Sequence, residues 1–312
     1  MKIIAQMDDI KSINIEKDST FAIMLAAQER GHEIFYFLPQ TLSMQNNIIK
    51  ANIYKIKLQK KINDHVQILE NKIDELVNYD AILVRQDPPF DMNYITNSYI
   101  LERIKDKILI LNDPVQIRNC PEKIFVNDFA DFTPPTIITS DLDQIKEFQE
   151  KYQEIIIKPL YSCGGDGVFY LKENDQNINV LVETMINHYK APLIAQKFIK
   201  DVKNGDKRVL LLNGEILGAV NRKPQGNDIR SNFHAGGMAQ KAKLNKKELE
   251  ICKIVGQELR NRGLIFVGID LIGNYVTEIN VTSPTGINEI NYLNNSKIED
   301  QIIKFIENNS VN

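Results

Sequence analysis

Three oxygen-bearing side chains stand in two apolar segments close to the C-terminus. Asp270 lies in the run LIFVGIDLI, and Glu278 and Asn280 lie in the run YVTEINV. Carboxylate and amide oxygens are hard ligands, suited to Mg²⁺ that also binds phosphate. The E-x-N spacing places Glu278 and Asn280 on one face of a strand. This set predicts a metal site, and the alternative is a polar strand edge without a ligand.

The position of Asp270 adds a condition to this prediction. An ideal two-residue turn at Gly273-Asn274 pairs Asp270 with Thr277, and Asp270 then faces away from Glu278. A shared metal site therefore requires an irregular turn or a β-bulge, and bulges are common beside active sites.

Two lysines and a glycine segment could together hold a polyphosphate. Lys158 ends the apolar run EIIIK directly before a proline, and Lys123 lies in the turn C-P-E-K. Each lysine alone is more often a surface residue with a buried stem. The segment GGDG (164–167) could close over phosphates through backbone N–H groups, or it could be a plain hairpin turn. Neither a P-loop nor a Rossmann glycine motif is present.

Arginines provide further anion-binding candidates. Arg208 and Arg222 lie in two segments that flank Asn213-Gly214, a strong hairpin signal, so they can face one site across the hairpin. Arg side chains bind phosphate or carboxylate in a bidentate manner, although a solvated hairpin edge is the alternative. Arg85 ends a buried strand, where open α/β sheets bind ligands. Arg230 belongs to the long loop 223–241, which we expect to be a functional lid.

The elements that position these residues follow from hydrophobic periodicity. Strands alternate with helices over about the first 115 residues, which predicts a parallel α/β sheet. The expected strands there are 2–7, 33–38, 81–85 and 108–111, and the expected helices are 18–30, 66–77 and 93–105. Beyond the junction at 112–114 the pattern becomes mixed α+β. Its expected strands are 136–139, 154–158, 193–199, 206–212, 216–222, 264–272 and 275–281, and its expected helices are 121–129, 141–152, 246–261 and 297–307.

Composition limits the class of protein. The 312 residues suggest about two domains, or three small ones. With 38 Lys+Arg and 41 Asp+Glu the net charge is −3, so no overall field attracts nucleic acid or an anionic membrane. The three cysteines are too widely spaced for a disulfide framework or a zinc knuckle, and the four histidines share no metal-ligand spacing. No run approaches the ~18 apolar residues of a membrane span, and no secretory signal is recognisable, so we expect a cytoplasmic protein.

Taken in chain order, the motifs resemble those of the ATP-grasp superfamily. They are Lys123, IIKP (156–159), GG (164–165), AQKFI (195–199), DKRVL (206–210), GID (268–270) and TEINVTSPTG (277–286). More narrowly, the chain resembles the prokaryotic glutathione synthetase family over essentially its whole length. The additional motifs are MDDIxxINIxKDS (7–19), DPPFD (87–91), YILER (99–103), RKPQG (222–226) and AGG (235–237).

This resemblance implies an activity and an architecture. The activity is ATP-dependent ligation of γ-glutamylcysteine with glycine through an acyl phosphate, giving glutathione, ADP and phosphate. The architecture is an N-terminal parallel α/β (pre-ATP-grasp) substrate domain over 1–120, followed by a two-lobed ATP-grasp fold with a small lobe over 121–200 and a C-terminal lobe over 201–312. The family also implies a homo-oligomer, a tetramer, with no nucleic acid or membrane partner.

The resemblance further implies a role for each candidate residue. ATP is the co-substrate: Lys123 and Lys158 contact its phosphates beneath Gly164 and Gly165, Asp206 lies near the ribose, and a hinge holds the adenine. The hinge residues are Gln196, Lys197, Phe198 and Ile199. Asp270, Glu278 and Asn280 bind two Mg²⁺ ions, with Mn²⁺ as the alternative metal. Arg208 and Arg222 stabilise the transferred phosphoryl group, and the substrate carboxylates are assigned to Arg85, Arg230, Ser283 and Thr285.

The glycine segment departs from the family pattern. The family shows K-P-L-D-G-x-G-G, whereas Tyr161-Ser162-Cys163 stand before Gly164 in this chain. Asp166 adds a negative charge close to the expected phosphates, so we expect it to point outward. Two other functions stay open: another ATP-grasp carboxylate–amine ligase, of the D-alanine or glutamate ligase type, and a non-catalytic ATP-binding regulator. The intact set of Asp270, Glu278 and Asn280 argues against the regulator.

Overall fold

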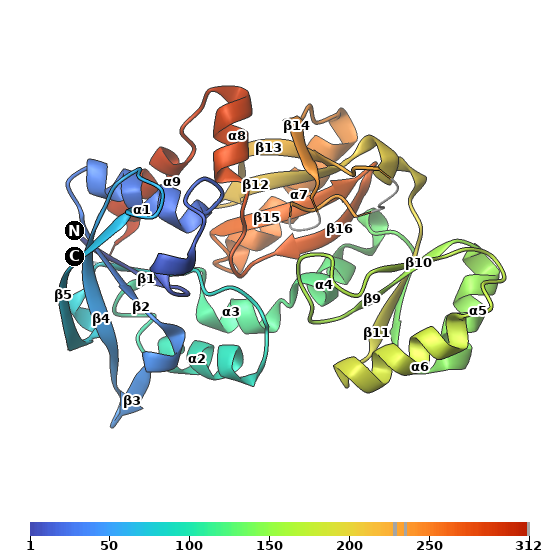
Figure 1. The fold of residues 1–312 in the computed structure, drawn as a ribbon, viewed down its shortest axis with the longest axis horizontal. Helices are drawn as coiled ribbons and strands as arrows, with labels where there is room; N and C mark the ends of the chain where they lie inside the picture. Colours follow the sequence, from blue (N-terminus) through green and yellow to red (C-terminus); the bar gives the residue numbers. More distant parts are fainter. Residues whose placement is uncertain (227–229, 234–235, 311–312) are drawn as a thin grey trace.

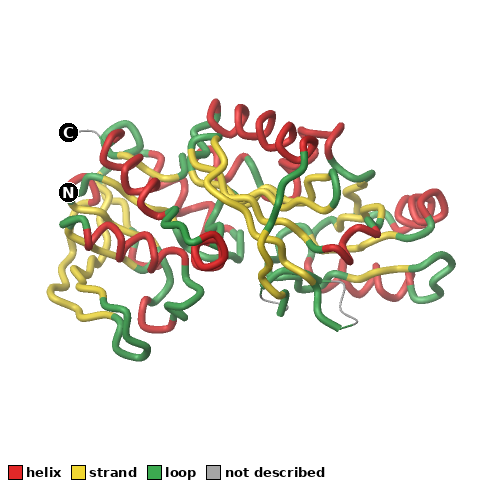
Figure 2. The backbone as a smooth tube through the Cα atoms, turned by 90° about the horizontal axis from the view of Figure 1, so that it is seen from above, coloured by secondary structure: helices red, strands yellow, loops and turns green. Residues whose placement is uncertain are grey.

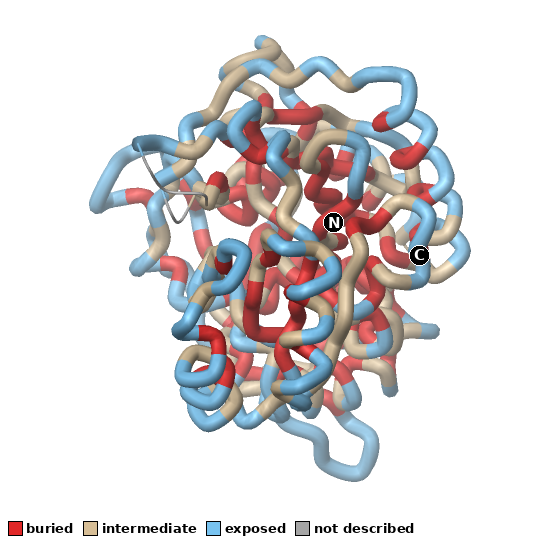
Figure 3. Tube along the Cα trace, turned by 90° about the vertical axis from the view of Figure 1, so that its right-hand side faces the viewer, coloured by how far each residue is buried: buried red, intermediate tan, exposed pale blue. Residues whose placement is uncertain are grey.

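The computed structural model describes residues 1–226, 230–233 and 236–310. Within these residues the strands form three sheets, which follow one another along the long axis of the molecule (Figure 1). Seen from above, the helices lie outside these sheets, and the N-terminal and C-terminal ends of the chain lie at the same end of the molecule (Figure 2). Buried residues run through the interior and exposed residues follow the outer loops (Figure 3).

The N-terminal sheet has a parallel centre, as predicted. The paired parallel strands are β2 (Glu33–Phe37), β1 (Lys2–Gln6), β6 (Ala81–Val84) and β7 (Leu109–Leu111). Ile3 and Ile4 are fully buried in different core clusters, which explains why β1 is apolar on both faces. Asp18 caps helix α1 (Ser19–Glu29) by accepting from the backbone N–H of Phe21. The other helices here are α2 (Met92–Glu102) and α3 (Pro114–Asn119).

The helix predicted over 66–77 is wrong. Val66–Glu75 forms strand β5, which pairs antiparallel with β4 (Ile48–Leu58), and β4 continues the sheet beyond β2 next to the short β3 (Ser43–Gln45). The apolar residues of 66–77 have helical spacing, but most side chains of β5 are exposed and form no core stripe. Hydrophobic periodicity in a short polar segment cannot distinguish a helix from a strand, so backbone pairing with β4 determines that this segment is a strand.

The second sheet forms a small lobe with the order β10-β9-β11-β8. Its strands are β8 (Thr136–Thr139), β9 (Ile155–Pro159), β10 (Phe169–Leu171) and β11 (Leu193–Lys197). Helices α5 (Leu142–Tyr152) and α6 (Ile178–Tyr189) share its apolar core, which includes Ile145, Ile157 and Val182. The short helix α4 (Glu122–Phe125) precedes this lobe. The glycine segment connects β9 to β10.

The third sheet has the order β14-β13-β12-β15-β16. Its strands are β12 (Asp206–Leu212), β13 (Glu215–Lys223), β14 (Met238–Lys241), β15 (Phe266–Ile272) and β16 (Tyr275–Asn280). The hairpin predicted at Asn213-Gly214 is confirmed, and both residues have the positive φ (48° and 79°) that the favoured two-residue turn requires. Helix α7 (Lys246–Asn261) packs on one face of this sheet.

The chain ends return to the N-terminal sheet. Helices α8 (Ile287–Asn294) and α9 (Glu299–Asn309) share a core cluster with α1, which includes Met24, Ile290 and Ile302. The third sheet is therefore packed against the N-terminal part of the chain. No helix in the described ranges has the length and apolar character needed to cross a membrane. The domain boundaries at 120 and 200 stay a prediction.

Candidate active site

A cleft of about 380 Å³ lies between the small lobe and the third sheet. The glycine segment, strands β9, β11, β12, β13, β15 and β16, and the loop after β16 all contribute to its wall. Every candidate residue except Arg85 lines it: Lys123, Lys158, Gly164, Gly165, Gln196, Lys197, Phe198, Ile199, Asp206, Arg208, Arg222, Arg230, Asp270, Glu278, Asn280, Ser283 and Thr285. Residues separated by up to 162 positions in the chain thus share one cavity.

The β-bulge that the metal site requires is present. Between Asp270 and Leu271 the register of β15 against β16 shifts, so Asp270 lies opposite Glu278 and not opposite Thr277. Residues directly opposite each other in an antiparallel pair lie on the same face of the sheet. Asn280 is opposite Gly268 on that face, and its amide nitrogen lies 3.3 Å from Asp270 Oδ2. The bulge therefore brings the three oxygen-bearing side chains together.

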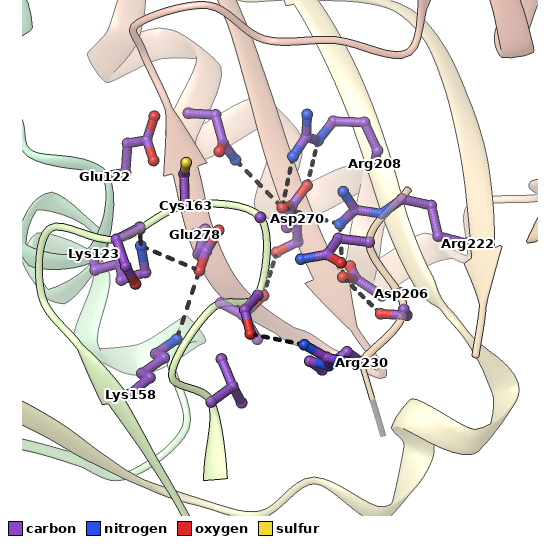
Figure 4. A pocket seen from close by; sticks show the side chains of 18 of the residues that line it. Glu122, Lys123, Lys158, Cys163, Asp206, Arg208, Arg222, Arg230, Asp270 and Glu278 are labelled. Carbon is purple, nitrogen blue, oxygen red and sulfur yellow. Dashed lines mark hydrogen bonds and ion pairs between the residues drawn. The ribbon is translucent and has the colours of Figure 1, made fainter. Parts of the chain in front are cut away.

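Four buried charged side chains form a network on β12, β13 and β15 (Figure 4). Arg208 donates from Nε to Asp270 Oδ1 at 2.5 Å and from Nη2 to Asp270 Oδ2 at 2.8 Å. Arg222 Nη2 lies 2.6 Å from Asp206 Oδ2 and 3.0 Å from Asp270 Oδ2. Antiparallel pairing explains this, because Arg208 is opposite Asp270 and Arg222 is opposite Asp206.

The two carboxylates of this network respond differently to their surroundings. Burial opposes ionisation of Asp270, but the guanidinium groups of Arg208 and Arg222 hold its pKa well below the ordinary value. Burial dominates at Asp206 and raises its pKa to about 6 despite Arg222. Asp206 also accepts from Ser231 Oγ at 3.1 Å, and its Oδ1 has no hydrogen-bond partner within the described residues.

Two lysines approach Glu278 from the opposite side of the cleft (Figure 4). Lys123 Nζ lies 3.8 Å and Lys158 Nζ lies 3.9 Å from Glu278 Oε1. Both lysines are buried, and burial lowers the pKa of Lys158 although Glu278 favours its charged form. Two buried ammonium groups near one carboxylate leave positive charge that an anionic ligand can neutralise.

The glycine segment meets the loop that precedes β14. Gly164 and Gly165 have positive φ (69° and 83°), a conformation that favours glycine. A Cβ on Gly165 would lie 2.7 Å from the amide nitrogen of Asn232, and Arg230 Nη1 donates to Gly165 O at 3.5 Å. Asp166 is exposed and does not line the cleft, in agreement with its expected outward orientation.

Arg85 does not line this cleft, and its predicted contact with a substrate carboxylate stays a prediction. It is buried, its Nε donates to Thr20 Oγ1, and its Nη2 donates to Pro284 O, each at 2.9 Å. Its position at the end of β6 makes it a bridge between the N-terminal sheet and the loop after β16. Ser283 and Thr285 flank that bridge. Ser283 Oγ donates to Asp87 Oδ1 at 2.9 Å, and Thr285 O accepts from Arg208 Nη1 at 3.3 Å.

Sequence reasoning missed several residues of the cleft wall. Glu122 accepts from Thr282 Oγ1 at 2.8 Å, and burial raises the pKa of its carboxyl group. Asp87 and Phe233 also line the cleft. Glu122 could have been found, because it adjoins Lys123 in the C-P-E-K turn. Asp87 lies in the DPPFD motif, but only tertiary packing brings it to the cleft.

The donor set fits a hard divalent cation. Asp270 and Glu278 present two carboxylates on one face, and the Asn280 amide lies beside them. In the described part of the chain no group of three or more His, Cys, Asp or Glu could hold a metal, so a cation in this cleft would depend on mixed carboxylate and amide ligands. The three cysteines are free, and His234 lies outside the described residues.

Comparison with known proteins gives one consistent result. Residues 1–118 match the family described as "Prokaryotic glutathione synthetase, N-terminal domain", and residues 122–295 match "Prokaryotic glutathione synthetase, ATP-grasp domain". The chain is 48% identical over 298 residues to a glutathione synthetase of Brucella melitensis, with 96% of each chain covered. It is 50% identical over 285 residues to that of Agrobacterium fabrum, covering 91% of this chain and 89% of the relative.

Solved structures of lower identity share the fold. The D-cycloserine synthetase DcsG has a TM-score of 0.68 at 12% identity, covering 97% of this chain and 99% of that chain. The ATP-grasp ligase PsnB, complexed with a minimal precursor, has a TM-score of 0.65 at 15% identity, with 98% of each chain covered. These likenesses show an ATP-grasp fold and do not distinguish substrates.

Proposed function

Because the chain belongs to the prokaryotic glutathione synthetase family, we propose that it joins γ-glutamylcysteine to glycine and converts ATP to ADP and phosphate. The chain is an ATP-dependent ligase with an ATP-grasp fold. One observation of the structure supports the detailed proposal most strongly. Four cationic side chains, Lys123, Lys158, Arg208 and Arg222, converge with Asp270 and Glu278 in a single cleft.

The chemistry of ligation requires this concentration of charge. A carboxylate is a poor acyl donor, and transfer of the ATP γ-phosphoryl group to it creates an acyl phosphate with a good leaving group. Catalysis of such a transfer is mainly positioning and charge neutralisation. We assign Lys123 and Lys158 to the ATP phosphates, and Arg208 and Arg222 to the transferred group and the oxyanion that forms when the amine attacks.

The nucleotide would lie along the hinge that follows β11. Lys197 ends β11, and Phe198 packs against Tyr170 with ring centroids 4.4 Å apart, which makes an apolar wall at this end of the cleft. We assign the adenine to residues 196–199. Asp206 accepts hydrogen bonds from Arg222 and Ser231. We therefore assign Asp206 to orienting Arg222, and not to a direct contact with the ribose.

A divalent cation would be held by Asp270, Glu278 and Asn280. When bound, it supplies positive charge that neutralises the phosphates. We propose Mg²⁺, with Mn²⁺ as the alternative, because the donors are all oxygens. Binding of the cation would compete with ion pairs that the two carboxylates make in this structure. Asp270 pairs with the two arginines, and Glu278 pairs with the two lysines.

Acyl phosphates react with water, so the cleft has to close during turnover. The hydrogen bond from Arg230 to Gly165 O joins the glycine segment to the loop before β14, and Asn232 of that loop leaves no room for a Cβ on Gly165. We propose that these two segments cover the reacting atoms together. Our candidates for the carboxylates of the two substrates remain Arg85, Arg230, Ser283 and Thr285. We also propose that the enzyme works in the cytoplasm as a homo-tetramer with domains over 1–120, 121–200 and 201–312.

The test is a reaction with ATP, Mg²⁺, γ-glutamylcysteine and a panel of amines, read by ADP release and mass spectrometry of the product. The proposal expects glutathione with glycine and little product with D-alanine or glutamate. Product with another amine at a higher rate would indicate a different carboxylate–amine ligase. ATP binding without ADP release for any acceptor would indicate a regulator and refute the proposal.

A further inference from the structure

Glu122 is the first residue of helix α4 and lines the cleft, but the function proposed above gives it no role. Its Oε1 accepts from Thr282 Oγ1 at 2.8 Å, and its Oε2 accepts no hydrogen bond from the described residues. The side chain is partly exposed, so the second oxygen is open to a ligand in the cleft. Figure 4 shows Glu122 on the side of the cleft opposite Arg222 and Asp206.

Glu122 lies at the end of the cleft away from the hinge. The turn at Gly273 lies beside Asp201, which closely follows the hinge residues, because a Cβ on Gly273 would lie 2.8 Å from Asp201 Oδ2. Strand β16 starts after this turn and ends at Asn280, and Thr282 follows. A nucleotide with its adenine at the hinge therefore extends its phosphates along β16 towards Thr282 and Glu122.

The other carboxylates of the cleft wall are already engaged or face solvent. Asp206 and Asp270 form ion pairs with arginines, and Glu278 forms ion pairs with two lysines. Asp87 is exposed. Glu122 forms no ion pair with any described residue, and it is the remaining carboxylate of the wall. A carboxylate without a cationic partner accepts a proton more readily than one that is paired.

The surroundings of Glu122 also favour proton uptake. Burial raises the pKa of its carboxyl group, and the charge of Glu278 adds to this effect, although Lys123 and Arg208 oppose it. Tyr94 and Cys163 face it as neutral groups, because burial raises the pKa of each. A general base is most effective when its pKa lies near the working pH, and a glutamate needs a raised pKa to approach that condition.

We propose that Glu122 is the general base that takes a proton from the acceptor amine. This inference rests on the proposed function. Glycine carries an ammonium group at neutral pH, which has no lone pair for attack. Transfer of one N–H proton to Glu122 frees the lone pair, and the nitrogen then bonds to the acyl carbon of the acyl phosphate. The C–O bond to phosphate breaks, and the departing phosphate takes the second proton from the nitrogen.

Two acceptors that differ in protonation test this role. Glycine needs a base at neutral pH, whereas hydroxylamine is already neutral and attacks an acyl phosphate directly to give a hydroxamate. With ATP, Mg²⁺ and γ-glutamylcysteine, Glu122→Gln should lower kcat/KM for glycine by about 10²–10⁴-fold, the usual contribution of a general base, and keep hydroxamate formation close to the wild-type rate. Glutamine still accepts from Thr282. Glu250→Gln changes a surface glutamate and should alter neither rate.

A shorter carboxylate gives a second measurement. Glu122→Asp should show a smaller loss that is again selective for glycine, so the test stands if only one variant folds, as judged by its melting temperature. The role is overturned if Glu122→Gln lowers both rates equally, as a lost support for Lys123 would do, or lowers neither. It is also overturned if Asp87→Asn, and not Glu122→Gln, shows the selective loss. A wild-type chain that forms neither product refutes the proposed function itself.

Discussion

Replacing Arg222 by Met should destabilise the fold strongly at pH 8 and less at pH 5. Arg222 is 3% exposed and joins Asp206 at 2.6 Å to Asp270 at 3.0 Å. Asp270 keeps both contacts with Arg208 after the change, so Asp206 is the group that loses its cation. Loss of one partner from a buried ion pair costs about 3–5 kcal/mol, because the remaining charge stays buried.

The pH dependence follows from the pKa of Asp206. Burial raises it to about 6, above the ordinary value of 3.8, so the protonated carboxyl stabilises the fold. In the wild-type chain this contribution is present below pH 3.8 and is lost as the pH rises through about 6. Removal of Arg222 raises this pKa further, so Asp206 is neutral at pH 5 in the variant. The cost there should fall to about 1–3 kcal/mol, the value for unpaired polar groups.

Urea unfolding at the two pH values measures both costs. Lys247→Met is the matched control, since Lys247 contacts Glu250 at the surface and its loss should cost less than about 1 kcal/mol at either pH. The variant with both Arg222→Met and Asp206→Asn should lose most of the pH dependence. An equal cost of Arg222→Met at both pH values would show that Asp206 is not the uncompensated charge and would refute the reasoning.

Three further changes test the site and its support. Lys158→Ala should lower kcat/KM for ATP more than tenfold, or about 1.4 kcal/mol, and unchanged steady-state kinetics would remove Lys158 from the phosphate site. Glu278→Gln should abolish ADP release at ordinary Mg²⁺ concentrations while the melting temperature stays the same, and wild-type rates would exclude it as a metal ligand. Gly256→Ala gains about 1 kcal/mol of helix propensity, but its Cβ would meet Gly214 O at 2.2 Å. We expect a net loss of about 1–3 kcal/mol from this overpacking, and a higher melting temperature would contradict it.

Local patterns predicted most elements because the signals lie within the elements themselves. The capped helix after Asp18, the Asn213-Gly214 hairpin and helix α7 depend on caps, turn residues and apolar spacing close in sequence. The helix prediction for 66–77 was wrong for the opposite reason. The backbone partners of this segment come from β4, and no residue inside the segment indicates that pairing.

The sequence by itself determined the chemical types of the site: oxygen donors in the last hairpin, one lysine at a strand end and another in a turn, and arginines across a hairpin. It also required a bulge for Asp270 to face Glu278, and the structure has one. Only the tertiary structure decided that Arg85 bridges two parts of the chain and that Glu122 faces the cleft. The physical reason is that types and spacing are properties of one segment, whereas the direction of a buried charge is decided by partners from distant segments.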